Sequence, residues 1–169
     1  MKVLITGSKG FIRTHLGAEF ESNGYEVLRC DLADGDGIVP MDIMKPDDVK
    51  AILKQYEPDV LVNMAGQANV ALSWKKPQLT AEINVIGTIN VLEALRTAEK
   101  QDIRTILIGS GEEYGYIRKD ACPLSESEPL NPGNIYAATK ACQGMIGEIY
   151  ARAYKMDIVM VRAFNHSGP

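Results

Sequence analysis

The sequence of 169 residues lacks the features that mark secreted, membrane and metal-binding proteins. Its three cysteines, Cys30, Cys122 and Cys142, form no CxxC pair and no metal-ligand set. We therefore expect reduced thiols, no metal site and a cytoplasmic location. The apolar run at residues 3–5 is far too short for a signal peptide or a membrane span. These absences exclude the secreted, membrane and zinc-finger classes.

The sequence also lacks a large excess of charge of one sign, because its 18 Lys and Arg residues nearly balance its 22 Asp and Glu residues, for a net charge of −4. No run of Lys or Arg offers the positive stripe that neutralises phosphates, so we expect no nucleic-acid partner. Hydrophobic residues make up 46% of the chain, which is enough for one core. A compact monomer of this size would expose about 8,200 Å². We expect a single globular domain over residues 1–169.

Short runs rich in β-branched residues alternate with longer stretches of helical periodicity. Six strands are predicted at 2–6, 25–30, 37–40, 59–63, 104–109 and 157–162, and four helices at 10–23, 46–56, 78–99 and 134–154. Such brief apolar strands are typical of a parallel sheet that is buried on both faces. The pattern predicts a Rossmann-type α/β fold: a doubly wound parallel sheet, helices on both faces, and strand order 3-2-1-4-5-6.

The last two predicted helices carry apolar residues around much of their circumference. Two interpretations are open. The helices are deeply buried within one molecule, or their outer face packs against a second copy in a homodimer formed through helices 78–99 and 134–154.

The turn after the first strand has the pattern of a phosphate-binding loop. Gly7 and Gly10 allow a tight turn and a close approach to a pyrophosphate, which the following helix N-terminus stabilises. Asp31 lies 21 residues beyond Gly10, where a carboxylate meets the adenosine ribose of NAD and repels the 2′-phosphate of NADP. We expect NAD, with NADP as the alternative. Arg13 stands where a third glycine would let the helix pack closely, so it is expected to weaken the pyrophosphate site; the alternative is that it adds a cation near the phosphates.

Tyr136 and Lys140 are spaced i,i+4 and therefore share one face of the last helix. A nearby ammonium favours phenolate and lowers the pKa of a tyrosine, which suits proton transfer near neutral pH. Ser110 follows the fifth strand at the carboxyl edge of the sheet, where ligands of α/β proteins bind. Ser110 can hydrogen-bond the same substrate oxygen as Tyr136, or it can simply cap the strand end.

These motifs, with the helix segment 84–88 and the closing segment 162–169, resemble the extended short-chain dehydrogenase/reductase family over essentially the whole chain. That family comprises the nucleotide-sugar epimerases, dehydratases and reductases. Segments 108–115 and 164–169 are most similar to the GDP-6-deoxy-4-keto-mannose reductases, and the GDP-mannose 4,6-dehydratases are similar in the same segments. The resemblance implies a nucleotide-sugar substrate, with a GDP-hexose favoured.

The resemblance also implies a role for each matching residue. The cofactor-binding set comprises Gly7, Gly10, Phe11, Ile12, Asp31, Asp42, Ile43, Met64, Ala65, Gly66, Tyr136 and Lys140. The implied catalytic set comprises Ser110, Tyr136, Lys140 and Glu112. The implied substrate-binding set comprises Gln67, which is expected to point toward substrate, Ser110, Glu112 and Asn165, with His166 as a weaker candidate.

Reduction of a GDP-4-keto-6-deoxy-hexose is the favoured activity, and others are open beside it. In a 4,6-dehydratase, Glu112 in a partly desolvated cleft would abstract the C5 proton of the sugar; otherwise Glu112 is simply a charge at a strand end. An epimerase would use the same groups without net redox change. Family members usually continue into a C-terminal lobe that grips the nucleotide diphosphate, and that lobe is missing here. We therefore favour a fragment of a longer enzyme over a short, non-catalytic dinucleotide-binding module.

Overall fold

The computed structural model describes residues 1–9, 11–35, 37–117 and 122–166, and only the backbone at residues 11, 13 and 14. Six parallel strands form one sheet in the order β3-β2-β1-β4-β5-β6, which confirms the predicted topology. The strands are β1 (Lys2–Thr6), β2 (Glu26–Asp31), β3 (Ile38–Pro40), β4 (Val60–Asn63), β5 (Arg104–Ile108) and β6 (Ile158–Val161).

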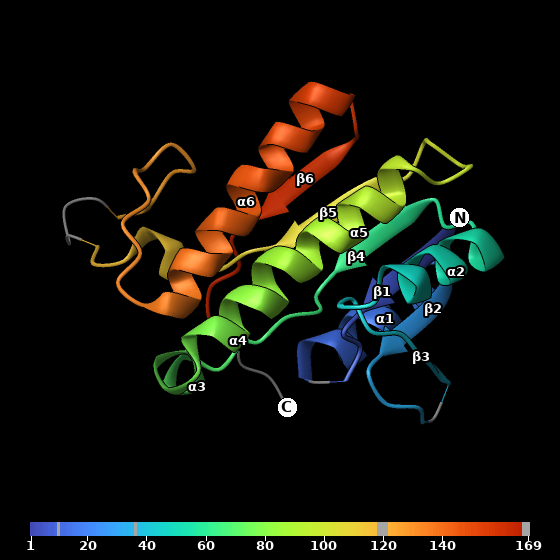
Figure 1. Cartoon of the computed structure of the whole chain (residues 1–169), viewed down its shortest axis with the longest axis horizontal. Coiled ribbons are helices and arrows are strands. Elements are labelled where there is room, and N and C mark those ends of the chain that lie inside the picture. The colour runs from blue at the N-terminus through green and yellow to red at the C-terminus, as the bar shows by residue number, and fades with distance from the viewer. Residues whose placement is uncertain (10, 36, 118–121, 167–169) are drawn as a thin grey trace.

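Helices lie on both faces of this sheet (Figure 1). One face is covered by α2 (Pro46–Tyr56), α5 (Gly87–Arg96) and α6 (Ile135–Tyr154), and the other by α1 (Phe11–Ser22). Successive residues of a strand point to opposite faces. Val3 and Ile5 therefore join the core beneath α1, whereas Leu4 joins the core beneath the other three helices. The Rossmann-type prediction is confirmed.

The predicted helix 78–99 is divided into three parts. It begins as α4 (Pro77–Ala81), widens into the π-helical turn η1 (Glu82–Ile86) and continues as α5. Asn84 lies in the π-helical turn with its side chain almost fully buried. A π turn inserts an extra residue into an α-helix and is frequent at functional sites.

Two short helices were not predicted. The first is α3 (Val70–Lys75), where the Asn69 side chain caps the N-terminus by accepting from Leu72 N at 2.9 Å. It carries the single tryptophan of the chain, Trp74, which is 62% exposed. The second is the 3₁₀ turn η2 (Gly111–Tyr114), directly after β5. Among the described residues, no helix is both long enough and apolar enough to cross a bilayer.

Candidate functional site

A cleft of about 340 Å³ opens at the carboxyl ends of β1, β2 and β4. It brings together residues that are far apart in the sequence, among them Gly7, Asp31, Asp42, Ile43, Ala65 and Gly66. Ligands of open parallel sheets bind at this edge, where the strand order reverses between β1 and β4.

Gly7 lets the loop after β1 pass close to the loop after β4. Its φ is +64°, and a Cβ at this position would lie 2.7 Å from Ala65 N. Thr6 joins the same two loops, because its Oγ1 donates to Asn63 Oδ1 at 2.7 Å and accepts from Ala65 N at 3.1 Å. The wall of the cleft is therefore bare backbone here, as a close approach to a phosphate requires.

Several predictions about this loop fall outside the described structure. Gly10 and the side chains of Phe11 and Arg13 are not among the described groups. The expected pyrophosphate contacts and the expected weakening by Arg13 therefore stay predictions.

The Asp31 carboxylate lies at the end of β2 and lines the cleft. Its Oδ2 accepts from Lys9 N and its Oδ1 accepts from Leu32 N, both at 2.7 Å. An ionised carboxylate has about four acceptor positions, so two remain for a ligand. The carboxylate thus holds the phosphate-binding loop and can also accept ribose hydroxyls.

Asp42 and Ile43 form the far wall of the same cleft. Asp42 Oδ1 accepts from Met44 N at 2.9 Å, and Asn90 Nδ2 donates to Ile43 O at 3.0 Å. A Cβ on Gly87 would lie 2.6 Å from Ile43 Cδ1, so the Ile43 side chain packs directly against the backbone of α5.

A second cavity, of about 230 Å³, adjoins the first, and Gly66 lines both. It holds most of the remaining predicted site residues, namely Ile12, Met64, Ser110, Tyr136, Lys140, Asn165 and His166. Its walls come from the start of α1, the loops after β4, β5 and β6, and one face of α6. The spacing argument for Tyr136 and Lys140 therefore agrees with their placement on one cavity wall.

Tyr136 is 9% exposed and hydrogen-bonds through its side chain to Ser110. Burial raises the pKa of Tyr136, the Ser110 hydrogen bond opposes that rise, and the carboxylates of Glu113 and Glu112 add to it. The expected lowering of the pKa of Tyr136 is therefore wrong for this structure, because desolvation of the phenolate outweighs the Ser110 hydrogen bond that favours it. The phenol keeps its proton at neutral pH.

Lys140 is directed toward the end of β5. Its Nζ donates to Ile108 O at 2.8 Å and to Gln143 Oε1 at 3.1 Å. The side chain is 5% exposed, so these acceptors solvate a buried ammonium on the wall of the second cavity.

Ser110 confirms the capping interpretation, whereas its hydrogen bond to a substrate oxygen stays a prediction. It is the N-cap of η2, where its hydroxyl accepts from Glu112 N at 3.2 Å, and it also bonds to Tyr136. The serine is therefore fixed at the carboxyl edge of β5 with its hydroxyl toward the second cavity.

Comparison with known proteins identifies the family. The family model described as GDP-mannose 4,6 dehydratase matches residues 4–169. The chain belongs to this family. The GDP-6-deoxy-D-mannose reductase of Pseudomonas aeruginosa is 28% identical over 99% of this chain and 53% of its own length. A putative UDP-glucose 4-epimerase of Methanocaldococcus jannaschii is 32% identical over 98% of this chain and 56% of its own length. The chain thus spans about half the length of the curated relatives it matches.

Solved structures of related enzymes share the fold. The UDP-glucose 4-epimerase of Brucella ovis, in complex with NAD, superposes with a TM-score of 0.88 at 29% identity, covering 97% of this chain and 52% of that one. RMD of Pseudomonas aeruginosa, complexed with NADPH, superposes with a TM-score of 0.86 at 26% identity, covering 100% and 56%. The family therefore includes relatives with different sugar chemistries on one fold.

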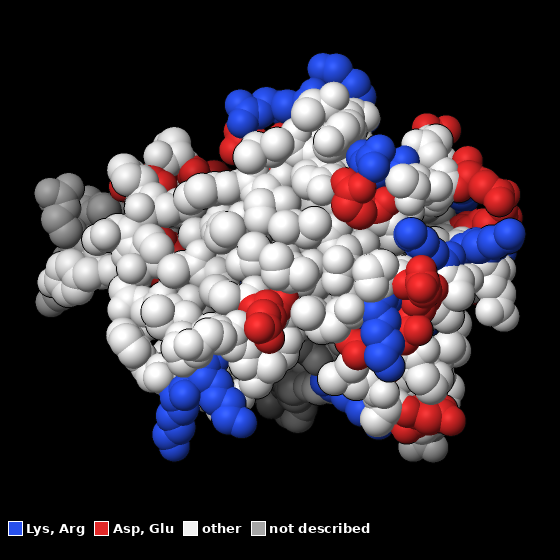
Figure 2. All heavy atoms as spheres, viewed as in Figure 1, with Lys and Arg blue, Asp and Glu red and all other residues white. Residues whose placement is uncertain are grey.

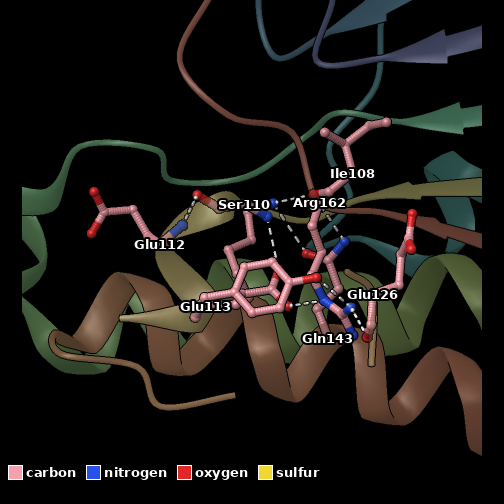
Figure 3. A network of polar contacts seen from close by, with 9 residues as sticks. Ile108, Ser110, Glu112, Glu113, Glu126, Gln143 and Arg162 are labelled. Carbon is pink, nitrogen blue, oxygen red and sulfur yellow. Dashed lines mark hydrogen bonds and ion pairs between the residues drawn. The ribbon is translucent and has the colours of Figure 1, made fainter. Parts of the chain in front are cut away.

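Within this GDP-mannose 4,6-dehydratase family domain, Glu112 lies differently from our expectation. Its side chain is exposed rather than desolvated, and its Oε2 accepts from Asn134 Nδ2 at 3.0 Å. It lines a third cavity, of about 290 Å³, which shares Ser110 and Asn165 with the second. A 3₁₀ turn has three residues per turn, so the inward direction of Glu113 sends Glu112 outward (Figure 3).

Gln67 lines the first cleft and not the second cavity, whose wall passes from Gly66 to Ala68. Its Nε2 donates to Thr80 Oγ1 at 2.9 Å and to Asn69 O at 3.0 Å, and its Oε1 accepts from Asn69 N. The Gln67 amide therefore joins the turn before α3 to Thr80 of α4, with one hydrogen-bonding direction left over, and its expected contact with substrate stays a prediction.

Sequence reasoning missed Asn84 as a site residue. Its Oδ1 accepts from Gln67 N at 2.7 Å, while its Nδ2 donates to Gln67 O at 3.1 Å and to Thr139 Oγ1 at 2.9 Å. Asn84 thus joins the cofactor-side loop after β4 to the residue before Lys140. The segment 84–88 carried the family resemblance, but only the π turn shows why the asparagine faces inward.

Proposed function

We propose that this chain is the dinucleotide-binding domain of a nucleotide-sugar-modifying enzyme, and specifically of a reductase acting on a GDP-4-keto-6-deoxy-hexose. One observation carries the proposal: the cleft at Asp31 and the cavity at Ser110, Tyr136 and Lys140 share Gly66. A ligand that enters the first can therefore extend into the second. The relatives complexed with NAD or NADPH support a dinucleotide as that ligand.

The residues present fit such a cofactor. Gly7 offers bare backbone to the phosphates, Asp31 retains acceptor capacity for ribose hydroxyls, and Asp42 with Ile43 walls the adenine side. Met64, Ala65 and Gly66 line the way to Tyr136 and Lys140. When bound, a nicotinamide dinucleotide supplies or accepts a hydride.

The protein's own groups then handle the proton. In the reductase direction, the Ser110 hydroxyl donates a hydrogen bond to the C4 carbonyl oxygen of the sugar, and the proton of Tyr136 Oη passes to that oxygen as it gains negative charge. A tyrosine whose pKa is raised by burial still carries its proton at neutral pH and is suited to this donor role. Lys140, on the same wall, stabilises the phenolate that remains.

The preference for a reductase rests on the similarity of segments 108–115 and 164–169 to the GDP-6-deoxy-4-keto-mannose reductases. The position of Glu112 does not separate a reductase from a dehydratase. Its exposed carboxylate accepts from Asn134 and lines the third cavity beside Ser110 and Asn165, where a sugar would find room. Since the chain spans about half the length of its relatives, we propose that further chain in such an enzyme supplies the lobe that grips the nucleotide diphosphate.

A substrate assay of the intact protein tests this proposal. GDP-4-keto-6-deoxy-mannose with reduced dinucleotide should yield the C4 alcohol, and GDP-mannose with NAD should yield no 4-keto product. Tyr136→Phe should lower kcat by about 10²-fold or more because it removes the proton donor. Release of a 4-keto-6-deoxy sugar from GDP-mannose would establish the dehydratase instead, and turnover of neither with intact cofactor binding would favour a non-catalytic module.

We also propose that the protein forms a homodimer through helices 78–99 and 134–154, which correspond to α4, η1, α5 and α6. Leu79, Ile86, Met145 and Ile149 are exposed on these adjacent elements. Figure 2 shows that the face formed by these helices is largely uncharged. An exposed apolar face on two packed helices is the kind of surface that a two-fold symmetric partner buries.

A further inference from the structure

An ion pair between a buried carboxylate and the partly exposed Arg162 lies next to Ser110 (Figure 3). Glu113 is 2% exposed, and its two oxygens have separate partners. Oε1 accepts from Ser110 N at 2.7 Å, while Oε2 accepts from Arg162 Nε at 3.1 Å. A buried carboxylate is strongly destabilising when it loses its partner, so Glu113 depends on Arg162 for its charge to stay in place.

The local sequence makes room for this carboxylate. A Cβ on Gly109 would collide with Glu113 Oε1, so glycine is required for the carboxylate to reach the peptide of Ser110. Ser110 and Glu113 together form a capping box, in which each residue satisfies a backbone N–H of the turn η2.

Arg162 holds more than the carboxylate. Its Nη1 donates to Tyr114 Oη at 3.1 Å and to Glu126 O at 3.4 Å, and the guanidinium lies 5.3 Å from the centre of the Tyr114 ring. The planar guanidinium of Arg162 has several N–H donors and can therefore bind the turn η2 and the loop at Glu126 at once, which a lysine ammonium cannot do in this geometry. Arg162 therefore links β6 to the turn that begins with Ser110.

The position of Ser110 follows from these contacts. Its N–H is fixed by Glu113, and its hydroxyl accepts from Glu112 N and contacts Tyr136. If the pair is broken, η2 loses the contact that holds its first peptide, and the hydroxyl loses its direction toward the second cavity.

We infer that Glu113 and Arg162 are positioning residues for Ser110, and that the pair keeps the serine hydroxyl aligned with Tyr136 and with the substrate oxygen. The reacting role of that hydroxyl rests on the proposed function. The alignment of Ser110 with Tyr136 does not, and it can be measured on the protein without any substrate.

The charges around Tyr136 make the measurement possible. Glu112 and Glu113 face it from η2, Lys140 lies on its own helix, and His166 lines the same cavity. The guanidinium of Arg162 lies against Glu113 and offsets its charge. Removal of the Glu113 charge therefore changes the ionisation of Tyr136 by itself, so the contribution of the Ser110 contact is measured by comparing serine with alanine at residue 110 within each variant.

The experiment compares Arg162→Met with Glu113→Gln in the intact protein. Tyr136 is titrated with ¹³C at Cζ, with Tyr136→Phe to assign the signal, in each background with Ser110 and with Ser110→Ala. In the parent, Ser110→Ala should raise the pKa of Tyr136, whereas in Arg162→Met and Glu113→Gln, where the hydroxyl is already misplaced, it should leave that pKa unchanged. Both variants should also lower kcat for the ketosugar by about 10²-fold with little change in KM, because both misplace Ser110.

Two further variants keep the test decisive. Arg162→Lys preserves the charge but not the planar guanidinium, so Ser110→Ala should leave the pKa of Tyr136 unchanged in this background too, and kcat should still fall. Asp157→Asn, which removes the carboxylate of the exposed Arg104–Asp157 pair at the opposite edge of the sheet, should behave as the parent in both readings. A rise in the pKa of Tyr136 on Ser110→Ala that is as large in Arg162→Met and Glu113→Gln as in the parent, or a kcat within about twofold of the parent, would overturn the inference. Absence of all ketosugar activity in the parent would refute only the proposed function, since the titration still decides the alignment of Ser110.

Discussion

The two oxygens of the Asp31 carboxylate each accept a backbone N–H, from Lys9 and from Leu32, and each retains room for one more donor. We predict that Asp31→Asn lowers the preference for NAD over NADP by about tenfold, because a neutral amide no longer repels a 2′-phosphate. Calorimetric titration with both dinucleotides measures this. Asp34→Asn, in the same turn, is the matched control and should leave the preference unchanged. Equal selectivity in Asp31→Asn and the parent would contradict the role of Asp31.

Ser110 and Tyr136 give a second prediction for single residues. The hydrogen bond from Ser110 opposes the rise that burial causes in the pKa of Tyr136. Ser110→Ala should therefore raise the pKa of Tyr136 further, whereas Ser110→Thr, which keeps the hydroxyl, should not. Tyrosine ionisation followed by NMR distinguishes the two variants. An unchanged pKa in Ser110→Ala would mean that the hydroxyl does not contact the phenol in solution.

Single residues also show where sequence reasoning reached its limit. The strand ends and the i,i+4 spacing were enough to place Asp31, Ser110, Tyr136 and Lys140 at one edge of the sheet. The direction of Glu112 depends on the 3₁₀ turn η2, in which Glu113 is drawn inward by a partner 49 residues away. No local pattern reveals such a partner.

Among the elements, the strands were the most predictable. Each is a brief apolar run between polar turns, and each lies within one residue of its predicted bounds. The helix 78–99 was not predicted in full because the π turn at Asn84 depends on tertiary hydrogen bonds to Gln67 and Thr139. The helix α3 did carry a local signal, the capping residue Asn69, but it is shorter than the windows in which helical periodicity is apparent.

The contact between α5 and the cleft yields a prediction at this scale. Gly87→Ala would place a methyl group against Ile43 and press that side chain into the cleft. We expect a loss of about 1–3 kcal/mol in the free energy of unfolding and weaker NAD binding. Gly144→Ala, in α6 with open space around the new methyl group, should instead stabilise the protein by about 0.5–1 kcal/mol. Thermal unfolding and calorimetry report both, and an equal response of the two variants would contradict the close packing of α5 on Ile43.

The whole molecule exposes 9613 Å², which is roughly a sixth more than the value of about 8,200 Å² expected for a compact monomer of its mass. Part of the excess is apolar. Met145 and Ile149 on α6 are each more than half exposed. The prediction of a homodimer remains to be tested, and burial of this face would remove apolar surface from water.

Light scattering tests the oligomeric state directly. The protein should be a dimer at micromolar concentration, and Ile149→Glu should make it a monomer, because an unpaired charge would be buried in the interface. Val159→Glu, at a similarly exposed apolar position on β6, should leave the dimer intact. A parent protein that stays monomeric at these concentrations would exclude the interface.

Trp74 gives this molecule an optical reporter of its own. It is the single indole of the chain, it lies on the short helix α3, and that helix is joined through the Gln67 turn to Gly66, which lines both cavities. Emission excited near 295 nm comes only from this side chain, with no correction for a second fluorophore of its type. Any ligand that contacts the Gly66 loop should alter the solvation of the indole. Occupancy of the two cavities can therefore be followed by the wavelength of the tryptophan emission maximum in unlabelled protein.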